Sequence, residues 1–201
     1  MAFFKTRKDT QKAPESTSCL EYLHDVVYIL ALILVLFTFC MRVVIVSGSS
    51  MFSTLVHGDY LLLINRPLCG ELERGDIVVA GMERFKDGEP IVKRVIATEG
   101  QTVDIDFRAG IVYVDGVALQ EDYIYTPTHL SEGMEFPLVV EEGCLFLMGD
   151  NRMDSRDSRA PEIGLVDERE ILGRAVFLLM PGTGRGEYTV EKDLGRIGGP
   201  N

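Results

Sequence analysis

Residues Val46 to Leu55 have the sequence Val-Ser-Gly-Ser-Ser-Met-Phe-Ser-Thr-Leu and join a long apolar run to a segment of different character. The small residues at 47–50 predict a turn that leads from a helix into a globular part. We interpret Ser50 as a candidate nucleophile. A serine in a run of small residues is usually only a loop residue, so the rest of the chain must support this interpretation.

An uncharged run, Val26 to Met41, lies just before this stretch. As a helix it would be about 24 Å long, and apolar neighbours extend it toward the roughly 30 Å of a bilayer core. We predict one transmembrane helix over 22–46, after a tail at 1–21. More basic residues precede the span than follow it, which predicts a single-pass plasma-membrane protein with a cytoplasmic tail and an extracytoplasmic domain. The alternative is a cleaved signal peptide.

Beyond the span, short apolar runs bounded by Gly, Pro and Asn predict a mostly β domain over 47–181. The predicted strands are Tyr60–Ile64, Ile77–Ala80, Ile91–Ala97, Val103–Asp106, Ile111–Val114, Val117–Leu119, Cys144–Met148 and Ala175–Met180. Asp115-Gly116 predicts a hairpin, because both positions of a type I′ turn need positive φ. An acidic surface insertion is expected at 120–137, a short helix within 161–172, and a flexible Gly-rich tail at 182–201.

The formal charge of the 201-residue chain is −11, which argues against nucleic acid as a partner because phosphate binding needs a basic face. The four cysteines show no spacing typical of a metal site, and no metal or other cofactor is expected. A disulfide between Cys69 and Cys144 stays open at this point.

Three further segments contain charged residues in compact motifs. They are Arg-Gly-Asp-Ile-Val-Val at 74–79, Lys-Arg-Val-Ile at 93–96 and Gly-Asp-Asn-Arg-Met-Asp-Ser-Arg-Asp-Ser-Arg at 149–159. Alone, each has an ordinary interpretation as a turn, an exposed strand or a solvated loop. Together with Ser50-Met51, and in this order, they resemble the type I signal peptidase family in the short form typical of Gram-positive bacteria. The resemblance runs from the apolar run to about residue 181.

This resemblance implies a signal-peptidase-like catalytic domain and a membrane-bound serine endopeptidase. Such an enzyme cleaves signal peptides from exported preproteins after small residues at −1 and −3, so exported preproteins and the lipid bilayer are the expected partners. Ser50 would be the nucleophile and Lys93 the general base. A lysine accepts a proton only when neutral, and burial favours the neutral form. Apolar residues flank Lys93 at 91–92 and 95–96.

The resemblance also implies residues that support the site. Ser155 would hydrogen-bond and orient the lysine, while Asp157, Arg159 and Arg94 would form an ion-pair framework. The backbone N–H of Ser50 would stabilise the oxyanion of the transition state.

Shallow apolar pockets would select the small substrate residues. By position in the motifs, Met51, Leu55 and Val92 are the candidates to line these pockets. Core packing is the competing explanation for all three, and the sequence does not indicate an oligomeric state.

Two positions depart from the family pattern. Ser53 stands where the motif has proline, which is expected to loosen the loop, because proline fixes φ. Gly48 stands where some members have a hydroxyl that helps to bind the oxyanion. These departures leave an alternative open, namely a catalytically weak or inactive membrane-anchored binding protein of the same fold.

Other chemistries fit the sequence less well. A Ser-His-Asp triad would need a histidine, and His57 has no motif around it. A calcium loop at 150–157 is disfavoured because arginines interleave its carboxylates.

Overall fold

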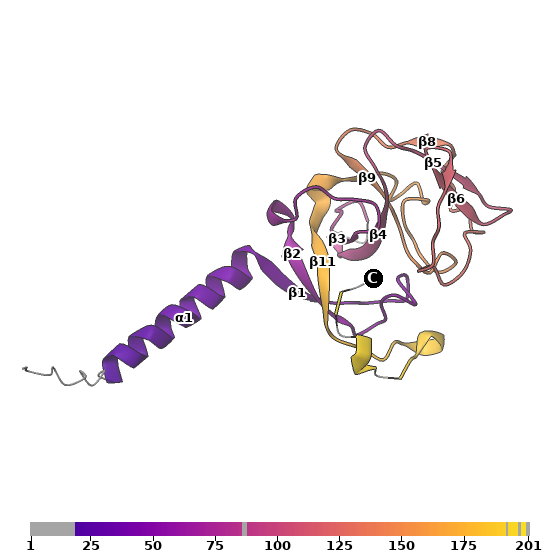
Figure 1. Cartoon of the computed structure of the whole chain (residues 1–201). Coiled ribbons are helices and arrows are strands. Elements are labelled where there is room, and N and C mark those ends of the chain that lie inside the picture. The colour runs from indigo at the N-terminus through magenta and orange to yellow at the C-terminus, as the bar shows by residue number, and fades with distance from the viewer. Residues whose placement is uncertain (1–18, 86–87, 192, 197, 200–201) are drawn as a thin grey trace, which may run out of the picture.

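The structure, a computed structural model, describes residues 19–85, 88–191, 193–196 and 198–199. One long helix, α1 (Cys19–Phe39), projects away from a mostly β domain (Figure 1). None of its residues is buried, and its length and apolar composition suit a membrane span. The predicted fold class, a β-rich domain behind one N-terminal apolar helix, is confirmed. Most of the tail predicted at 1–21 lies outside the described residues.

The predicted span of 22–46 is wrong at its C-terminal end. α1 ends at Phe39, and Met41–Ile45 form strand β1, which pairs antiparallel with β2 (Tyr60–Asn65). The β-branched residues at 43–46 suit an extended backbone, and pairing with β2 satisfies their backbone groups.

Asn65, at the end of β2, ties α1 to this sheet. Its side-chain amide donates to the Phe39 carbonyl at 3.0 Å, and its Oδ1 accepts from Arg42 Nε at 3.0 Å. Its backbone N–H donates to the Cys40 carbonyl at 3.0 Å. The last carbonyls of a helix lack donors within the helix, so Asn65 supplies one from the sheet. Cys40 is therefore the single residue between α1 and β1, and Asn65 holds its carbonyl.

Two antiparallel sheets make up the domain. The larger has the strand order β1-β2-β11-β3-β4-β9-β10, and the smaller has the order β7-β6-β5-β8. Their remaining strands are β3 (Ile77–Ala80), β4 (Ile91–Thr98), β5 (Thr102–Asp106), β6 (Ile111–Val114), β7 (Val117–Ala118), β8 (Leu138–Val139), β9 (Cys144–Met148), β10 (Val166–Asp167) and β11 (Ile171–Met180). The smaller sheet lies at the end of the domain remote from α1 (Figure 1).

Most predicted strands occur within one or two residues of their expected bounds, although β11 begins four residues early. The β6–β7 turn has Asp115 at φ 51° and Gly116 at φ 76°, which confirms the predicted hairpin. The helix expected within 161–172 is replaced by β10 and a 3₁₀ turn, Glu168–Glu170. Other 3₁₀ turns are Arg66–Leu68, Gly186–Tyr188 and Leu194–Arg196.

The described part of the segment 182–201 is docked rather than loose, which corrects the expected flexible tail. Gly182 N–H donates to Asp59 Oδ1 at 2.7 Å, and Arg196 Nη2 donates to Asp59 Oδ2 at 2.7 Å. Asp59 is fully buried, and a buried carboxylate needs such partners. Cys69 and Cys144 are free thiols, so the disulfide left open by the sequence does not form.

Candidate active site

Lys93 and Ser50 meet although they are far apart in the sequence. Lys93 Nζ lies 2.7 Å from Ser50 Oγ and also donates to the Val92 carbonyl at 3.0 Å. Lys93 lies on β4, an inner strand of the larger sheet, and is only 4% exposed. The two atoms are therefore as close as a nucleophile and its base must be for proton transfer.

Apolar side chains hold the loop that carries Ser50. Met51 and Leu55 are each 1% exposed and pack in one core cluster with Leu61 and Leu63 of β2. This packing anchors the nucleophile loop on the core beside β2. Contact of Met51 and Leu55 with substrate stays a prediction.

Polar contacts hold the same loop from the other side. The Ser50 carbonyl accepts from the Asn151 N–H at 3.0 Å, and the Ser49 carbonyl accepts from Asn151 Nδ2 at 3.3 Å. Ser49 Oγ donates to Asp154 Oδ2 at 2.6 Å. Asn151 and Asp154 are thus positioning residues that the sequence analysis did not single out. The loosening expected from Ser53 stays a prediction.

Gly48 has a backbone reason to be glycine. Its φ is +99°, a conformation that residues with a side chain rarely adopt. Its N–H donates to His57 Nδ1 at 3.3 Å. The missing hydroxyl at this position therefore follows from the shape of the loop.

A cavity of about 260 Å³ opens beside the Ser50–Lys93 pair. Ile91, Val92 and Phe85 form an apolar part of its lining, and Asp154 and Arg156 add charged groups. Of the three predicted pocket residues, Val92 lines this cavity. Its contact with substrate stays a prediction.

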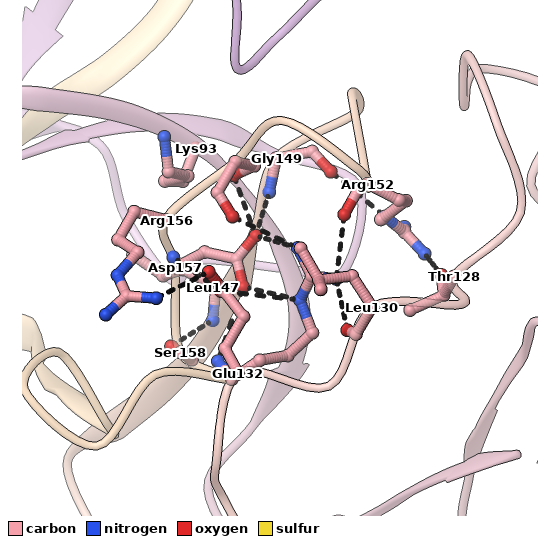
Figure 2. Close-up of polar contacts among 12 residues, drawn as sticks. Lys93, Thr128, Leu130, Glu132, Leu147, Gly149, Arg152, Arg156, Asp157 and Ser158 are labelled. Atoms are coloured by element: carbon pink, nitrogen blue, oxygen red, sulfur yellow. Dashed lines mark hydrogen bonds and ion pairs between the residues drawn. The ribbon is translucent and has the colours of Figure 1, made fainter. Parts of the chain in front are cut away.

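Asp157 is the centre of a buried hydrogen-bond network, which Figure 2 shows together with Lys93. Its Oδ2 accepts from the Gly149 N–H at 2.9 Å and from Ser155 Oγ at 2.8 Å. Arg159 donates to both carboxylate oxygens, at 2.8 and 2.9 Å. Burial acts to raise the pKa of Asp157, but the hydrogen bonds and charge of Arg159 outweigh it and lower the pKa below its usual value.

Ser155 and the Ser50 carbonyl approach each other across Gly149. A Cβ on Gly149 would collide with both the Ser155 hydroxyl and the Ser50 carbonyl oxygen, so only glycine permits this packing. Ser155 therefore lies next to the nucleophile loop, and its hydroxyl donates to Asp157. Orientation of Lys93 by Ser155 stays a prediction.

Arg94 has a different partner from the one expected. Its Nε and Nη2 donate to the two oxygens of Asp150 at 2.9 and 2.7 Å, and its guanidinium stacks 4.1 Å from the centre of the Tyr123 ring. The predicted framework of Arg94 with Asp157 and Arg159 is therefore two separate buried pairs. Each arginine forms a two-pronged pair with one carboxylate, a geometry that its planar guanidinium favours.

The comparisons with known proteins identify the family. Residues 19–180 match the family described as signal peptidase, peptidase S26. This chain belongs to that family. It is accordingly a hydrolase of the serine peptidase class.

Two relatives and one solved structure show how far the similarity extends. The chain is 34% identical to "Signal peptidase I T" of Bacillus subtilis (strain 168), over 88% of this chain and 92% of that protein. It is 32% identical to "Signal peptidase I" of Bacillus amyloliquefaciens, over 83% and 88%. A crystal structure of a signal peptidase I from Enterococcus faecalis V583 aligns with a TM-score of 0.42 and 30% identity, over 52% of this chain and 96% of that chain.

In this S26 peptidase, the insertion predicted at 120–137 covers the last motif instead of lying only on the surface. Arg152 donates to the buried Thr128 hydroxyl at 2.7 Å and to Glu121 at 3.0 Å. Arg159 donates to the Leu130 carbonyl at 3.0 Å. The two buried guanidinium groups explain why a polar segment folds against this surface, since each needs acceptors.

Some site residues that were not singled out could have been found from the sequence, and others could not. Asp150, Asn151 and Arg152 belong to the last motif, so the motif itself could have identified them as site residues. Glu121 and Thr128 lie in a segment without a motif, and only the fold brings them to Arg152. Among the described residues, no group of three His, Cys, Asp or Glu side chains is placed to hold a metal ion.

Proposed function

We propose that this peptidase cuts signal peptides from exported preproteins with a Ser50–Lys93 dyad. The observation that carries the proposal is the 2.7 Å hydrogen bond between Ser50 Oγ and Lys93 Nζ in a buried setting. Burial disfavours an ammonium ion, so this environment favours the neutral amine that can accept a proton.

The reaction follows from this geometry in two halves. Lys93 takes the proton of Ser50 Oγ as the oxygen attacks the scissile carbonyl, and the resulting ammonium returns the proton to the leaving amine. Water then attacks the acyl-enzyme with Lys93 again as the base. We assign the developing oxyanion to the backbone N–H of Ser50. The bond from the Asn151 N–H to the Ser50 carbonyl helps to hold the backbone of this residue in place.

The cavity beside the dyad supports a preference for small residues before the cut. The apolar side chains of Ile91 and Val92 line one part of it, and Asp154 and Arg156 line another. The cavity has a volume of about 260 Å³. A shallow apolar wall selects by exclusion, because a large side chain would displace the chain from the nucleophile. We therefore propose alanine-sized residues at −1 and −3.

We also propose that α1 anchors the enzyme in the plasma membrane, with the N-terminus cytoplasmic and the catalytic domain outside. Its apolar length and exposed surface support an anchor, and the basic residues before it support the orientation. Protease added outside intact spheroplasts should digest the catalytic domain. Protection of that domain until the membrane is permeabilised would overturn this orientation.

The dyad is tested with full-length protein in detergent and a preprotein that contains an Ala-x-Ala site. Wild type should release the mature product. Ser50→Ala and Lys93→Ala should each lower kcat by about 10²–10⁴-fold, because each removes one half of the proton transfer. Ser131→Ala, an exposed serine of the insertion, should cut like wild type. Cleavage by Ser50→Ala or Lys93→Ala at the wild-type rate would refute the dyad.

The structure offers another explanation for one of the two departures behind the inactive-relative alternative. Gly48 has a backbone conformation that favours glycine, and contacts to Asn151 and Asp154 hold Ser49, while the effect of Ser53 on the loop stays a prediction. A wild-type protein that fails to cut the Ala-x-Ala substrate would restore that alternative.

A further inference from the structure

The loop between β1 and β2, residues 46–59, contains Ser50 and is closed at its base by two hydrogen bonds. Val46 N–H donates to the Asp59 carbonyl at 2.8 Å, and Gly58 N–H donates to the Val46 carbonyl at 2.9 Å. These bonds fix the two ends of the loop. The position of Ser50 within the loop depends on what holds the part between them.

The C-terminal segment that follows β11 lies against this loop, and Figure 1 shows it in yellow. Gly184 N–H donates to the His57 carbonyl at 3.1 Å. Arg196 Nη2 donates to the Thr54 carbonyl at 3.1 Å, and the same guanidinium holds the buried carboxylate of Asp59. The segment therefore contacts the loop at several positions between its base and the nucleophile.

Phe52, two residues after Ser50, is the contact of this kind nearest to the nucleophile. Its ring centre lies 5.2 Å from that of Tyr188 in the C-terminal segment and 4.8 Å from that of Tyr125 in the insertion. Aromatic rings at such distances attract one another. Met51, by contrast, is buried in the core. The chain just after Ser50 is therefore held by the core at one residue and by two aromatic rings at the next.

Tyr188 is itself fixed by the fold of its own segment. Val190 N–H donates to the Thr183 carbonyl at 2.8 Å, which closes the segment into a loop. Gly184 has φ +75°, and a Cβ on it would collide with the Tyr188 carbonyl, so only glycine permits this close packing. The match to the S26 family ends at residue 180, so Tyr188 lies beyond the matched residues.

We infer that Tyr188 is a positioning residue for the nucleophile and acts through the ring of Phe52. With this contact in place, the loop keeps Ser50 Oγ 2.7 Å from Lys93 Nζ. Without it, the loop gains other conformations, and a smaller fraction of the molecules has the hydroxyl within reach of its base. The inference rests on the proposed function, since it concerns cleavage by the Ser50–Lys93 pair.

The test measures kcat and KM of full-length variants in detergent on one Ala-x-Ala peptide. Tyr188→Ala should lower kcat about three- to tenfold and leave KM unchanged, because the lost contact holds the nucleophile and not the substrate. Tyr188→Phe should have wild-type kcat. It keeps the ring and removes only the hydroxyl, whose partners are the side chains of Asn151 and Glu187.

The matched control is Tyr113→Ala, which removes a half-buried ring from β6 in the smaller sheet. It should keep the wild-type kcat and KM. Circular dichroism at the assay temperature should show that all three variants are folded, so that a lower kcat reports the site and not a loss of folded protein.

The outcomes separate this inference from the proposed function. Wild-type kcat in Tyr188→Ala, or an equal loss in Tyr113→Ala, would overturn the positioning role and leave the dyad standing. A raised KM with unchanged kcat would also overturn it, because the segment would then bind substrate. A Tyr188→Phe variant as slow as Tyr188→Ala would exclude the ring contact. If wild type does not cut the peptide, the proposed function fails and this inference fails with it.

Discussion

Lys93 and Arg94 are consecutive residues of β4, both cationic and both only 4% exposed, yet their surroundings differ. Successive side chains of a strand point to opposite faces, so the two amino acids face different regions. Lys93 Nζ donates to the Ser50 hydroxyl and to the Val92 carbonyl. The Arg94 guanidinium donates to both carboxylate oxygens of Asp150.

Under the proposed dyad, this difference separates a catalytic residue from a supporting residue on one strand. A guanidinium is not deprotonated in proteins, so Arg94 with its carboxylate is a permanent ion pair. Burial disfavours an ammonium ion, so Lys93 has the surroundings that the proposed proton exchange with Ser50 requires. Three experiments test this separation, beginning with the one that should have the largest effect.

Lys93→Arg should abolish turnover while the domain stays folded. An arginine keeps the positive charge at this position but cannot act as a base, so kcat for an Ala-x-Ala peptide should fall by about 10²–10⁴-fold. Circular dichroism provides the folding control. A variant with wild-type kcat would show that charge, and not proton transfer, is what this face of β4 provides.

Arg94→Met should destabilise the fold, because it leaves the fully buried Asp150 without its charged partner. The free energy of unfolding, measured by urea denaturation, should fall by about 3–5 kcal/mol. The matched control is Arg169→Met, which breaks an exposed pair with Asp167 and should cost at most about 1 kcal/mol. Equal losses in the two variants would contradict the role of Arg94 as buried support.

Ser155→Ala should have the smallest effect on stability, because Asp157 keeps its bonds to Arg159 and to the Gly149 N–H. One lost hydrogen bond should lower the free energy of unfolding by about 1 kcal/mol. If Ser155 also orients Lys93, the pH profile of kcat should shift as well. An unchanged pH profile would limit Ser155 to support of the Asp157 network.

Local patterns predicted the strands well because each strand is a short apolar run with turn residues at its ends. The Asp115-Gly116 hairpin is the clearest case, since both residues have the positive φ that the turn requires. The end of α1 was missed because Val43 to Val46 suit a helix in a bilayer or a strand in a sheet. Only the pairing of β1 with β2 decides between them.

Within the site, the motifs identified Ser50 and Lys93, which the fold brings together, but not most of the long-range partners that hold the domain around them. Arg94 and Asp150 are 56 positions apart, and Arg196 and Asp59 are 137 apart. No local pattern reports contacts over such separations. Met51 and Leu55 illustrate a second limit, because an apolar residue next to a nucleophile suits a pocket wall and a core equally well.

Three hydrogen bonds of Asn65 hold the junction between α1 and β1, so the helix joins the sheet without a flexible linker. If α1 lies in the bilayer as we propose, β1 continues directly from it. The five residues of β1 span about 17 Å. Ser50 is then held at one height above the lipid headgroups. Under the proposed function, a substrate would be cut only if the distance from its own apolar stretch to its cleavage site matched that height.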